Sequence, residues 1–491
     1  MARWTRLISV SALVTTLSAP LTAHVGSPDV YFEGQAGPYR LLVAIRTPPV
    51  VPGVADVEVR ALDDTPREVR VVPLRLTGPG AVFAPVPDVA SRSRDDERFF
   101  TAKLWMMVTG AWQVRVTVEG ERGRGEVAIP VDALATRTLR LGAGLKLILI
   151  PLGLFLAFGF IAIVGASVGQ AQIDPGRELP RPRRRRAWIA RAIAAVLVAV
   201  AVLLSSRWWD AEANAYSRYL YKPIQMTPSL DQDGRLVLRL HDPGWLASRV
   251  LDDLVPDHGH PMHLFLVRTP ALDRLVHLHP RQVDAGLFEH DLPAVDGGRY
   301  HLLADIVHET GLPETVLSEM ELQTRAGQLT GDDSAADGST GFEPDRVASS
   351  LPDGGRIVWE RPSGPIVAKQ ATLFRFKVED ASGRPARDLE LYMGMPGHAV
   401  FVRRDLSVFA HVHPSGTAPM ASMALAAATL RSADAPRADP HAGHATAAAL
   451  PSVVTFPYGF PEPGDYRIFV QIRRSSGVQT GTFDARVDAS P

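Results

Sequence analysis

Two stretches of the chain repeat one pattern of histidine, proline and apolar residues. They read His258-Gly-His-Pro-Met-His263, Leu264 to Val267 and His277-Leu-His-Pro280, then Met393-Gly-Met-Pro-Gly-His398, Ala399 to Val402 and His411-Val-His-Pro414. When His263 is aligned with His398, the preceding prolines coincide and the closing His-x-His-Pro tetrads match with one inserted residue. The repetition predicts two related domains with equivalent sites.

Each His-x-His pair is expected on a β-strand, because the apolar runs around it are short and bounded by Pro and Gly. Residues i and i+2 of a strand face the same side of the sheet, about 7 Å apart along it. His277 and His279 therefore point the same way, as do His411 and His413. The last histidine of each opening motif starts a neighbouring strand and would supply a third imidazole to one metal ion.

The two copies differ where a soft-metal site would tolerate the difference. The second copy has Met393 and Met395 at the positions of His258 and His260. Imidazole suits Cu(II) and Zn(II), whereas thioether selects Cu(I), so the sequence predicts two copper-type sites, the second softer than the first. The candidate ligands are His258, His260, Met262, His263, His277 and His279 in the first site, and Met393, Met395, His398, His411 and His413 in the second.

A structural interpretation of these histidines stays open. A His-x-His pair can hydrogen-bond to backbone groups at a sheet edge, with Pro280 or Pro414 ending the strand. Three further histidines, His290, His301 and His308, are expected to be surface residues or incidental to the sites.

The composition excludes several other kinds of site. The chain has 491 residues, a net charge of −1 and no cysteine, so it is long enough for three or four domains and has no basic excess to suggest nucleic acid. Without cysteine it has no Cys-type zinc site, iron–sulfur cluster, thiol catalysis or disulfide. All of the 15 histidines except His24 fall between His241 and His444, which reflects either chance or the location of metal-binding domains.

Residues 1–23 have the pattern of a secretory signal peptide. Arg3 and Arg6 precede a short apolar core, and a small-residue region ends at Ala23, where cleavage is expected. An uncleaved anchor is the alternative. Cleavage would make His24 the N-terminal residue, whose amine and imidazole form a chelating pair for Cu(II), so His24 is an additional candidate ligand.

Two apolar segments predict transmembrane helices at residues 146–168 and 188–207, each long enough to cross a bilayer about 30 Å thick. Residues 169–187 between them are rich in arginine, so the positive-inside rule predicts a cytoplasmic loop; a nucleic-acid patch is the alternative for this cluster. Both flanking parts then lie outside. We expect a protein of the bacterial inner membrane with its N- and C-terminal domains in the periplasm.

The remaining chain divides into three β-sandwich domains with related strand patterns. They cover residues 24–139, 208–327 and 346–491, and a segment rich in Asp, Gly, Ser and Thr at 328–345 is expected to link the last two. An Ala- and Pro-rich insertion at 415–451 is typical of a flexible spacer, and its residues also suit a metal-capturing arm. The candidate ligands in it are Met420, Met423, His441 and His444.

Gly397 to Pro414, together with the strand Gly464-Asp-Tyr-Arg-Ile-Phe-Val-Gln471, resembles the YtkA-like domain of bacterial envelope proteins. Residues 260–280 with 298–307 resemble it more loosely, with Leu-Val in place of Phe-Ala. The resemblance implies immunoglobulin-like sandwiches of the CopC and FixH kind, associated with copper handling and oxidase maturation. The expected fold is mainly β, with three immunoglobulin-like β-sandwich domains and two transmembrane α-helices.

Together these features predict a membrane-anchored metal-binding protein that uses copper for copper handling, delivery or resistance. The expected partners are the lipid bilayer and a copper-donating or copper-accepting envelope protein, with no nucleic acid. The alternative is an envelope interaction or assembly protein, for example in oxidase maturation, whose histidines are structural. An enzyme is not expected, because the sequence shows no nucleophile–base constellation, no paired carboxylates and no Cys ligand of the multicopper oxidases.

Overall fold

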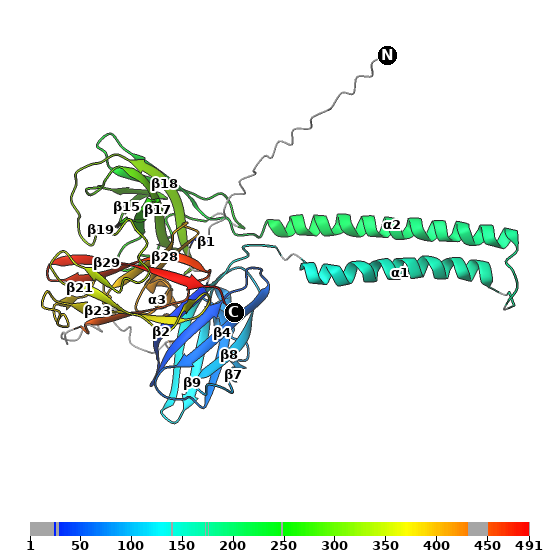
Figure 1. Cartoon of the computed structure of the whole chain (residues 1–491), viewed down its shortest axis with the longest axis horizontal. Coiled ribbons are helices and arrows are strands. Elements are labelled where there is room, and N and C mark those ends of the chain that lie inside the picture. The colour runs from blue at the N-terminus through cyan, green and yellow to red at the C-terminus, as the bar shows by residue number, and fades with distance from the viewer. Residues whose placement is uncertain are drawn as a thin grey trace, which may run out of the picture.

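The computed structural model of the chain is mainly β, with three α-helices in its described part (Figure 1). The structure describes residues 24–25, 29–138, 141–171, 173–174, 176–246, 249–430 and 450–490. Six sheets pair into three two-layer units, each around an apolar core, and two long helices extend from them as a hairpin. The signal peptide expected at residues 1–23 lies outside the described residues.

The first unit packs the sheet β2-β3-β4-β8-β7 against the sheet β10-β9-β5-β6. Side chains alternate between the faces of a strand, and in β9 this alternation buries Val114, Val116 and Val118 in the core between the sheets. The elements are β2 (Asp29–Ala36), β3 (Tyr39–Arg46), β4 (Gly53–Ala61), β5 (Glu68–Arg75), the 3-10 helix η1 (Pro79–Val82), β6 (Asp88–Val89), β7 (Ser91–Arg92), β8 (Phe99–Met106), β9 (Gly110–Gly120) and β10 (Gly123–Ala133).

The second unit packs the sheet β11-β12-β16-β15 against the sheet β18-β17-β13-β14-β19. The prediction that residues 328–345 form a linker is wrong for the middle of this segment. Four of its residues form β19, which pairs with β14. The strands are β11 (Gln225–Leu230), β12 (Leu236–His241), β13 (His263–Thr269), β14 (Arg274–Leu278), β15 (Arg281–Asp284), β16 (Leu287–His290), β17 (Gly298–Val307), β18 (Pro313–Leu322) and β19 (Ser334–Asp337).

The third unit packs the sheet β20-β21-β23-β27 against the sheet β1-β26-β25-β28-β29-β22, in which β24 also pairs with β28. Strand β1 of this sheet comes from the N-terminal part of the chain. It pairs in parallel with β26, with His24 opposite Val408. The strands are β1 (His24–Val25), β20 (Ala348–Ser350), β21 (Arg356–Glu360), β22 (Ile366–Val367), β23 (Thr372–Glu379), β24 (Leu389–Glu390), β25 (His398–Arg403), β26 (Val408–Val412), β27 (Val453–Tyr458), β28 (Gly464–Arg474) and β29 (Gly477–Asp488).

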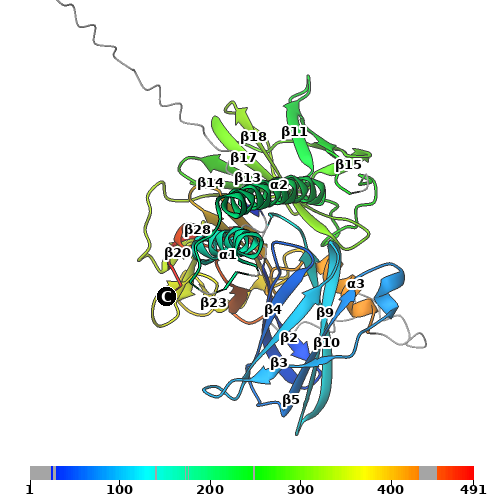
Figure 2. The same cartoon turned by 90° about the vertical axis from the view of Figure 1, so that its right-hand side faces the viewer.

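Helices α1 (Ala143–Gln170) and α2 (Arg181–Ser217) contain the two expected spans and are long and apolar enough to cross a membrane. The expected loop 169–187 is shorter than predicted, because α2 already begins at Arg181, and a proline is tolerated in a first helical turn. The hairpin projects away from the three β-units, which lie together at the end opposite the connection between α1 and α2 (Figures 1 and 2).

The first part of the insertion is not a flexible spacer, because it forms α3 (Met420–Ala428). Met423 packs against the core of the first unit, and Thr429 just after the helix donates a hydrogen bond to Gln113 Oε1 of that unit at 2.9 Å. Ser422 Oγ donates to the carbonyl oxygen of Gly311, in the second unit, at 3.0 Å. The helix therefore ties the third unit to both others. His441 and His444 lie outside the described residues.

The second and third units meet through the sheets that contain β13 and β25. Their facing side chains form a separate apolar cluster that both units share: Phe265, Val267, Leu272, Leu275, Leu303, Val400, Val402, Phe409 and Phe469. Next to it, the buried Arg467 forms an ion pair with Asp484 at 2.9 Å and donates to the carbonyl oxygen of Leu272, across the interface, at 3.0 Å. The interface strands β13 and β25 are therefore buried on both faces.

Candidate metal centre

Eight histidines gather beside this shared apolar cluster and form one continuous group, called here the histidine cluster. Phe265 of the apolar cluster stacks on His277, with ring centroids 4.1 Å apart, and lies 4.9 Å from His411. Across the interface, the rings of His263 and His411 are 5.6 Å apart. The members are His258, His260, His263, His277 and His279 of the second unit, and His398, His411 and His413 of the third.

Strand periodicity places these side chains as expected. On β14, Val276 and Leu278 belong to the core of the second unit, so His277 between them faces the third unit. On β26, Ala410 and Val412 belong to the core of the third unit, and His411 faces the second. The prediction that these histidines lie on the faces opposite their apolar neighbours is confirmed.

Equivalent tight turns precede β13 and β25. Asp257 and His260 exchange two backbone hydrogen bonds of 2.9 Å, and Tyr392 and Met395 do the same at 2.7 and 3.0 Å. The central residues have positive φ, 51° at His258 and at Met393, each followed by a glycine with φ 87° or 78°. Positive φ at both central positions is the requirement of a type I′ turn, which explains the His-Gly and Met-Gly dipeptides. The repeats therefore share a turn as well as a motif.

The first trio consists of His263, His277 and His279, whose ring nitrogens lie within 4.8 Å of one another. His263 Nδ1 is 3.2 Å from His277 Nε2, close to the roughly 3.3 Å that separates two nitrogens on one tetrahedral ion. Nε2 of His279 is buried without a hydrogen-bond partner. The ring centroid of His260 lies 4.1 Å from that of His279, with the two rings tilted by 31°. These residues all belong to the second unit.

The second trio consists of His258, His398 and His413, again within 4.8 Å. His411 Nε2 lies 3.1 Å from His398 Nδ1, beside the trio. Nε2 of His258 is buried without a hydrogen-bond partner. The sequence placed His258 in the first site, and that assignment is wrong, because its side chain joins two histidines of the third unit.

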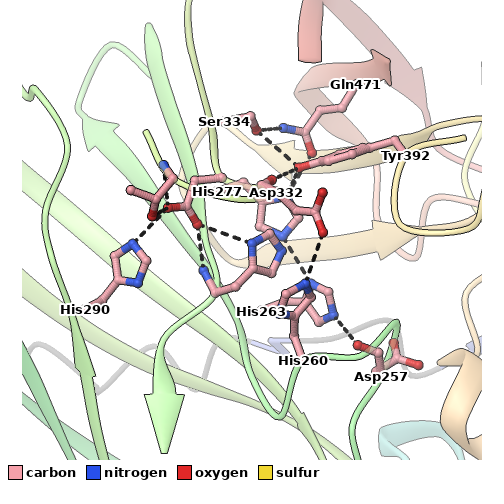
Figure 3. Close-up of polar contacts among 12 residues, drawn as sticks. Asp257, His260, His263, His277, His290, Asp332, Ser334, Tyr392 and Gln471 are labelled. Atoms are coloured by element: carbon pink, nitrogen blue, oxygen red, sulfur yellow. Dashed lines mark hydrogen bonds and ion pairs between the residues drawn. The ribbon is translucent and has the colours of Figure 1, made fainter. Parts of the chain in front are cut away.

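Hydrogen bonds to residues outside the cluster fix which nitrogens of His263 and His398 face inward. Figure 3 shows the contact between His263 and Asp257. His263 donates from Nε2 to the carbonyl oxygen of Asp257 at 3.0 Å, and His398 donates from Nε2 to that of Tyr392 at 3.1 Å. A carbonyl only accepts, so Nδ1 of each neutral ring carries a lone pair toward the interior. His411 Nδ1 lies 3.4 Å from the carboxylate of Asp305, and a neutral His411 ring with its proton on Nδ1 would direct the Nε2 lone pair toward Nδ1 of His398. A cation relieves two facing lone pairs, and metal-binding histidines are commonly oriented in this way.

Burial favours the neutral form of half of the cluster. It lowers the pKa of four histidines well below the usual value of 6.5, and the neighbouring imidazoles lower it further: His263, His277, His398 and His413. Neutral imidazole is the form that binds metals. Beside them, burial raises the pKa of Asp333, but hydrogen bonds from His279 and His290 outweigh it, so the pKa is lowered overall and this carboxylate stays charged.

The methionines predicted as ligands do not all lie near the histidine cluster. Met262 is fully buried in the core of the second unit, on the face opposite His263, and is not a ligand. Met423 packs on the first unit, and Met420 Sδ accepts a hydrogen bond from Ser415 Oγ at 3.6 Å. Met393 and Met395 lie on the turn equivalent to that of His258 and His260. Only the backbone of His24 is described, in β1.

The sequence interpretation missed the residues that orient the histidines. Asp305 and Gln471 lie directly opposite His263 and His398 in the sheets, so strand register could have identified them. Asp333 lay in the expected linker, and no sequence signal indicated it. Two other partners were also missed, Tyr392 and Ser334. His308 is buried and lies 2.7 Å from Asp253, so the surface prediction is wrong for it.

Comparisons with known proteins add little to this geometry. A family model described as a domain of unknown function (DUF8832) matches residues 350–489, within the third unit. No curated protein sequence matches the chain.

Several solved structures resemble the chain distantly. A tetra-tandem repeat from the extending region of a large adhesion protein is 8% identical, with a TM-score of 0.16, and the match covers 89% of this chain and 71% of that one. The ICAM-5 D1–D4 ectodomain fragment is 8% identical with a TM-score of 0.14, over 90% and 74%. E. coli alpha-2-macroglobulin is 10% identical with a TM-score of 0.16, over 90% and 26%. TM-scores this low support no inference about fold or function.

Proposed function

We propose that this chain is a membrane-anchored extracytoplasmic protein that binds copper in the histidine cluster, for copper handling, delivery or resistance. The observation that carries the proposal is the pair of histidine trios, each with ring nitrogens within 4.8 Å and each with a buried Nε2 that lacks a hydrogen-bond partner. A buried polar atom without a partner costs free energy unless a ligand compensates it. Imidazole-only sites suit Cu(II) and Zn(II).

The helix hairpin supports the membrane part of the proposal. The arginine-rich start of α2 lies at the tip of the hairpin, and the three β-units lie together at its base. If the hairpin spans the bacterial inner membrane with its arginine-rich tip in the cytoplasm, all three units are periplasmic, and we interpret them as immunoglobulin-like sandwiches. A reporter inserted after Gly176 should then behave as cytoplasmic, and a periplasmic readout would overturn this topology.

An open cavity of about 260 Å³ is lined by His279 of the cluster and by His290, among others. Its rim combines Arg235 and Arg281 with Glu289 and Asp291, so it carries no strong net charge. We propose this cavity as the route by which an ion reaches the first trio. The proposed role is binding and transfer of the ion, and no catalytic step is assigned.

Metal content of the full-length protein tests the proposal. The chain in detergent micelles is loaded with Cu(I) or Cu(II), desalted and assayed for bound copper. We expect two ions per chain, and we expect them to be lost when His277, His279, His411 and His413 are all changed to Ala. His301→Ala is the matched control, because His301 lies on β17 outside both trios and pairs with Glu319. If the parent retains no copper, or the fourfold variant retains as much, the histidines are structural and the assembly-protein alternative stands.

A further inference from the structure

One of the two trios is built across the interface between two units. His258 is fixed in the second unit, because the segment that carries it is hydrogen-bonded to β17: Val255 N donates to the carbonyl oxygen of Val307 at 2.8 Å. Its ring nevertheless lies 5.0 Å from His398 and 4.9 Å from His413 of the third unit. An ion held by this trio therefore has protein ligands in both units.

The other trio needs no such partner. His263, His277 and His279 all come from β13 and β14 or the residue that follows, and these strands pair with each other directly. Its dependence on the third unit is indirect, since His277 Nδ1 hydrogen-bonds to Gln471 Oε1 at 3.1 Å. The two trios thus differ in how far they rely on the interface.

The orienting contacts also cross the interface, in a reciprocal manner. Gln471 of the third unit contacts His277 of the second, and Asp305 of the second contacts His411 of the third. The two acceptors occupy equivalent positions, opposite His263 and opposite His398 in their sheets. Correct orientation of the imidazoles therefore requires the two units to be docked.

The turn that carries His258 is also tied to α3. The carboxylate of Asp257 accepts a hydrogen bond from the backbone N–H of Ala421, in the first turn of the helix, at 2.7 Å. The carbonyl of the same residue orients His263. This turn thus connects the first trio, the second trio and the helix that packs on the first unit.

We propose that copper occupancy of the second trio locks the second unit onto the third, whereas the first trio fills without doing so. This inference rests on the proposed function, because it assigns a structural consequence to one of its two ions. A ligand that binds only the docked arrangement stabilises that arrangement by mass action. The lock involves the turn at Asp257–His260 and the equivalent turn at Tyr392–Met395, which we expect to lose mobility together.

Two single substitutions separate the trios. His258→Ala removes the shared ligand, and His279→Ala removes a ligand of the first trio only. The full-length parent and both variants are loaded with copper in detergent micelles, assayed for metal, and compared with their metal-free forms by hydrogen–deuterium exchange of peptides covering residues 253–262 and 389–397.

For the parent we expect two ions, and exchange slowed about tenfold or more in both peptides. His279→Ala should hold one ion and still protect both peptides, whereas His258→Ala should hold one ion and leave 389–397 unprotected. The inference is overturned if His258→Ala retains two ions or protects 389–397 as the parent does. A parent that binds no copper would instead refute the proposed function, and this inference with it. Equal copper content in the parent and His301→Ala shows that loss is specific to the cluster.

Discussion

Asp305 provides the sharpest single test of how the histidine cluster is oriented. Its Oδ2 lies 3.4 Å from Nδ1 of His411, while its Oδ1 accepts a hydrogen bond from the hydroxyl of Thr315 at 2.5 Å. In Asp305→Asn, the amide oxygen can keep the bond to Thr315, and the amide NH₂ then faces His411. Nδ1 would have to accept that hydrogen bond, so the proton of the neutral ring moves to Nε2, the nitrogen that faces Nδ1 of His398 in the second trio.

The expected loss follows from this geometry. Removing an orienting partner of a metal-binding histidine typically lowers affinity about 10- to 100-fold. The 3.4 Å contact is longer than a strong charge-assisted hydrogen bond, and the Asp305 side chain is 22% exposed. We therefore expect the lower end, about tenfold, or about 1.4 kcal/mol.

The measurement is competition against a chromophoric copper chelator in the His279→Ala background, where the second trio holds the remaining ion. The matched control is Asp337→Asn, another Asp-to-Asn change on the second unit, whose carboxylate pairs with Arg274 at 2.6 Å and is 68% exposed. The control should leave the affinity unchanged. Equal affinity of Asp305→Asn and the control would show that Asp305 does not influence the second trio through His411.

Three further predictions concern the core, the interface and pH. Met262→Leu should leave the copper content unchanged and alter the free energy of unfolding by less than about 1.5 kcal/mol, because Met262 packs in the core of the second unit and Leu has a similar volume. A loss of copper in this variant would show that Met262 is a ligand. Arg467→Ala should destabilise the chain by about 3–5 kcal/mol in urea unfolding, because it leaves Asp484 buried and unpaired, and a change below 1 kcal/mol would refute that. Metal-free protein should lose stability as pH falls below about 6.5, because the folded state holds histidines such as His263 and His398 at lowered pKa while the unfolded chain binds protons; a flat thermal midpoint between pH 7.5 and 5.5 would contradict it.

Much of the fold was accessible from the sequence because its patterns are local. The apolar segments predicted α1 and α2, and alternation predicted that His277 and His411 face away from the cores of their units. The same alternation rules out Met262 as a neighbour of His263 in one site, since adjacent strand residues face opposite sides. That error came from counting ligand types along the chain without applying the strand period.

The interface between the second and third units was harder to predict, although the sequence contains one indication of it. Leu264 to Val267 and Ala399 to Val402 are continuously apolar, which is typical of strands buried on both faces. A sheet with one solvent-facing side would alternate. The runs therefore indicated that a second layer covers each sheet, but they carried no information on which layer it was. Asp333 was inaccessible for the same reason, because its contacts with His279 and His290 exist only once β19 has joined the sheet.

The exchange of His258 for Met393 acquires a different meaning once the units are docked. In two independent sites, the exchange would make the second site softer. In the structure the turn of the second unit reaches into the trio of the third, and the backbone of Met393 is close enough to His258 to influence its pKa. The residue at one turn tip therefore serves the trio of the other unit. The histidine content of a repeat then does not describe the site formed on that repeat, and ligand sets have to be assigned across the interface.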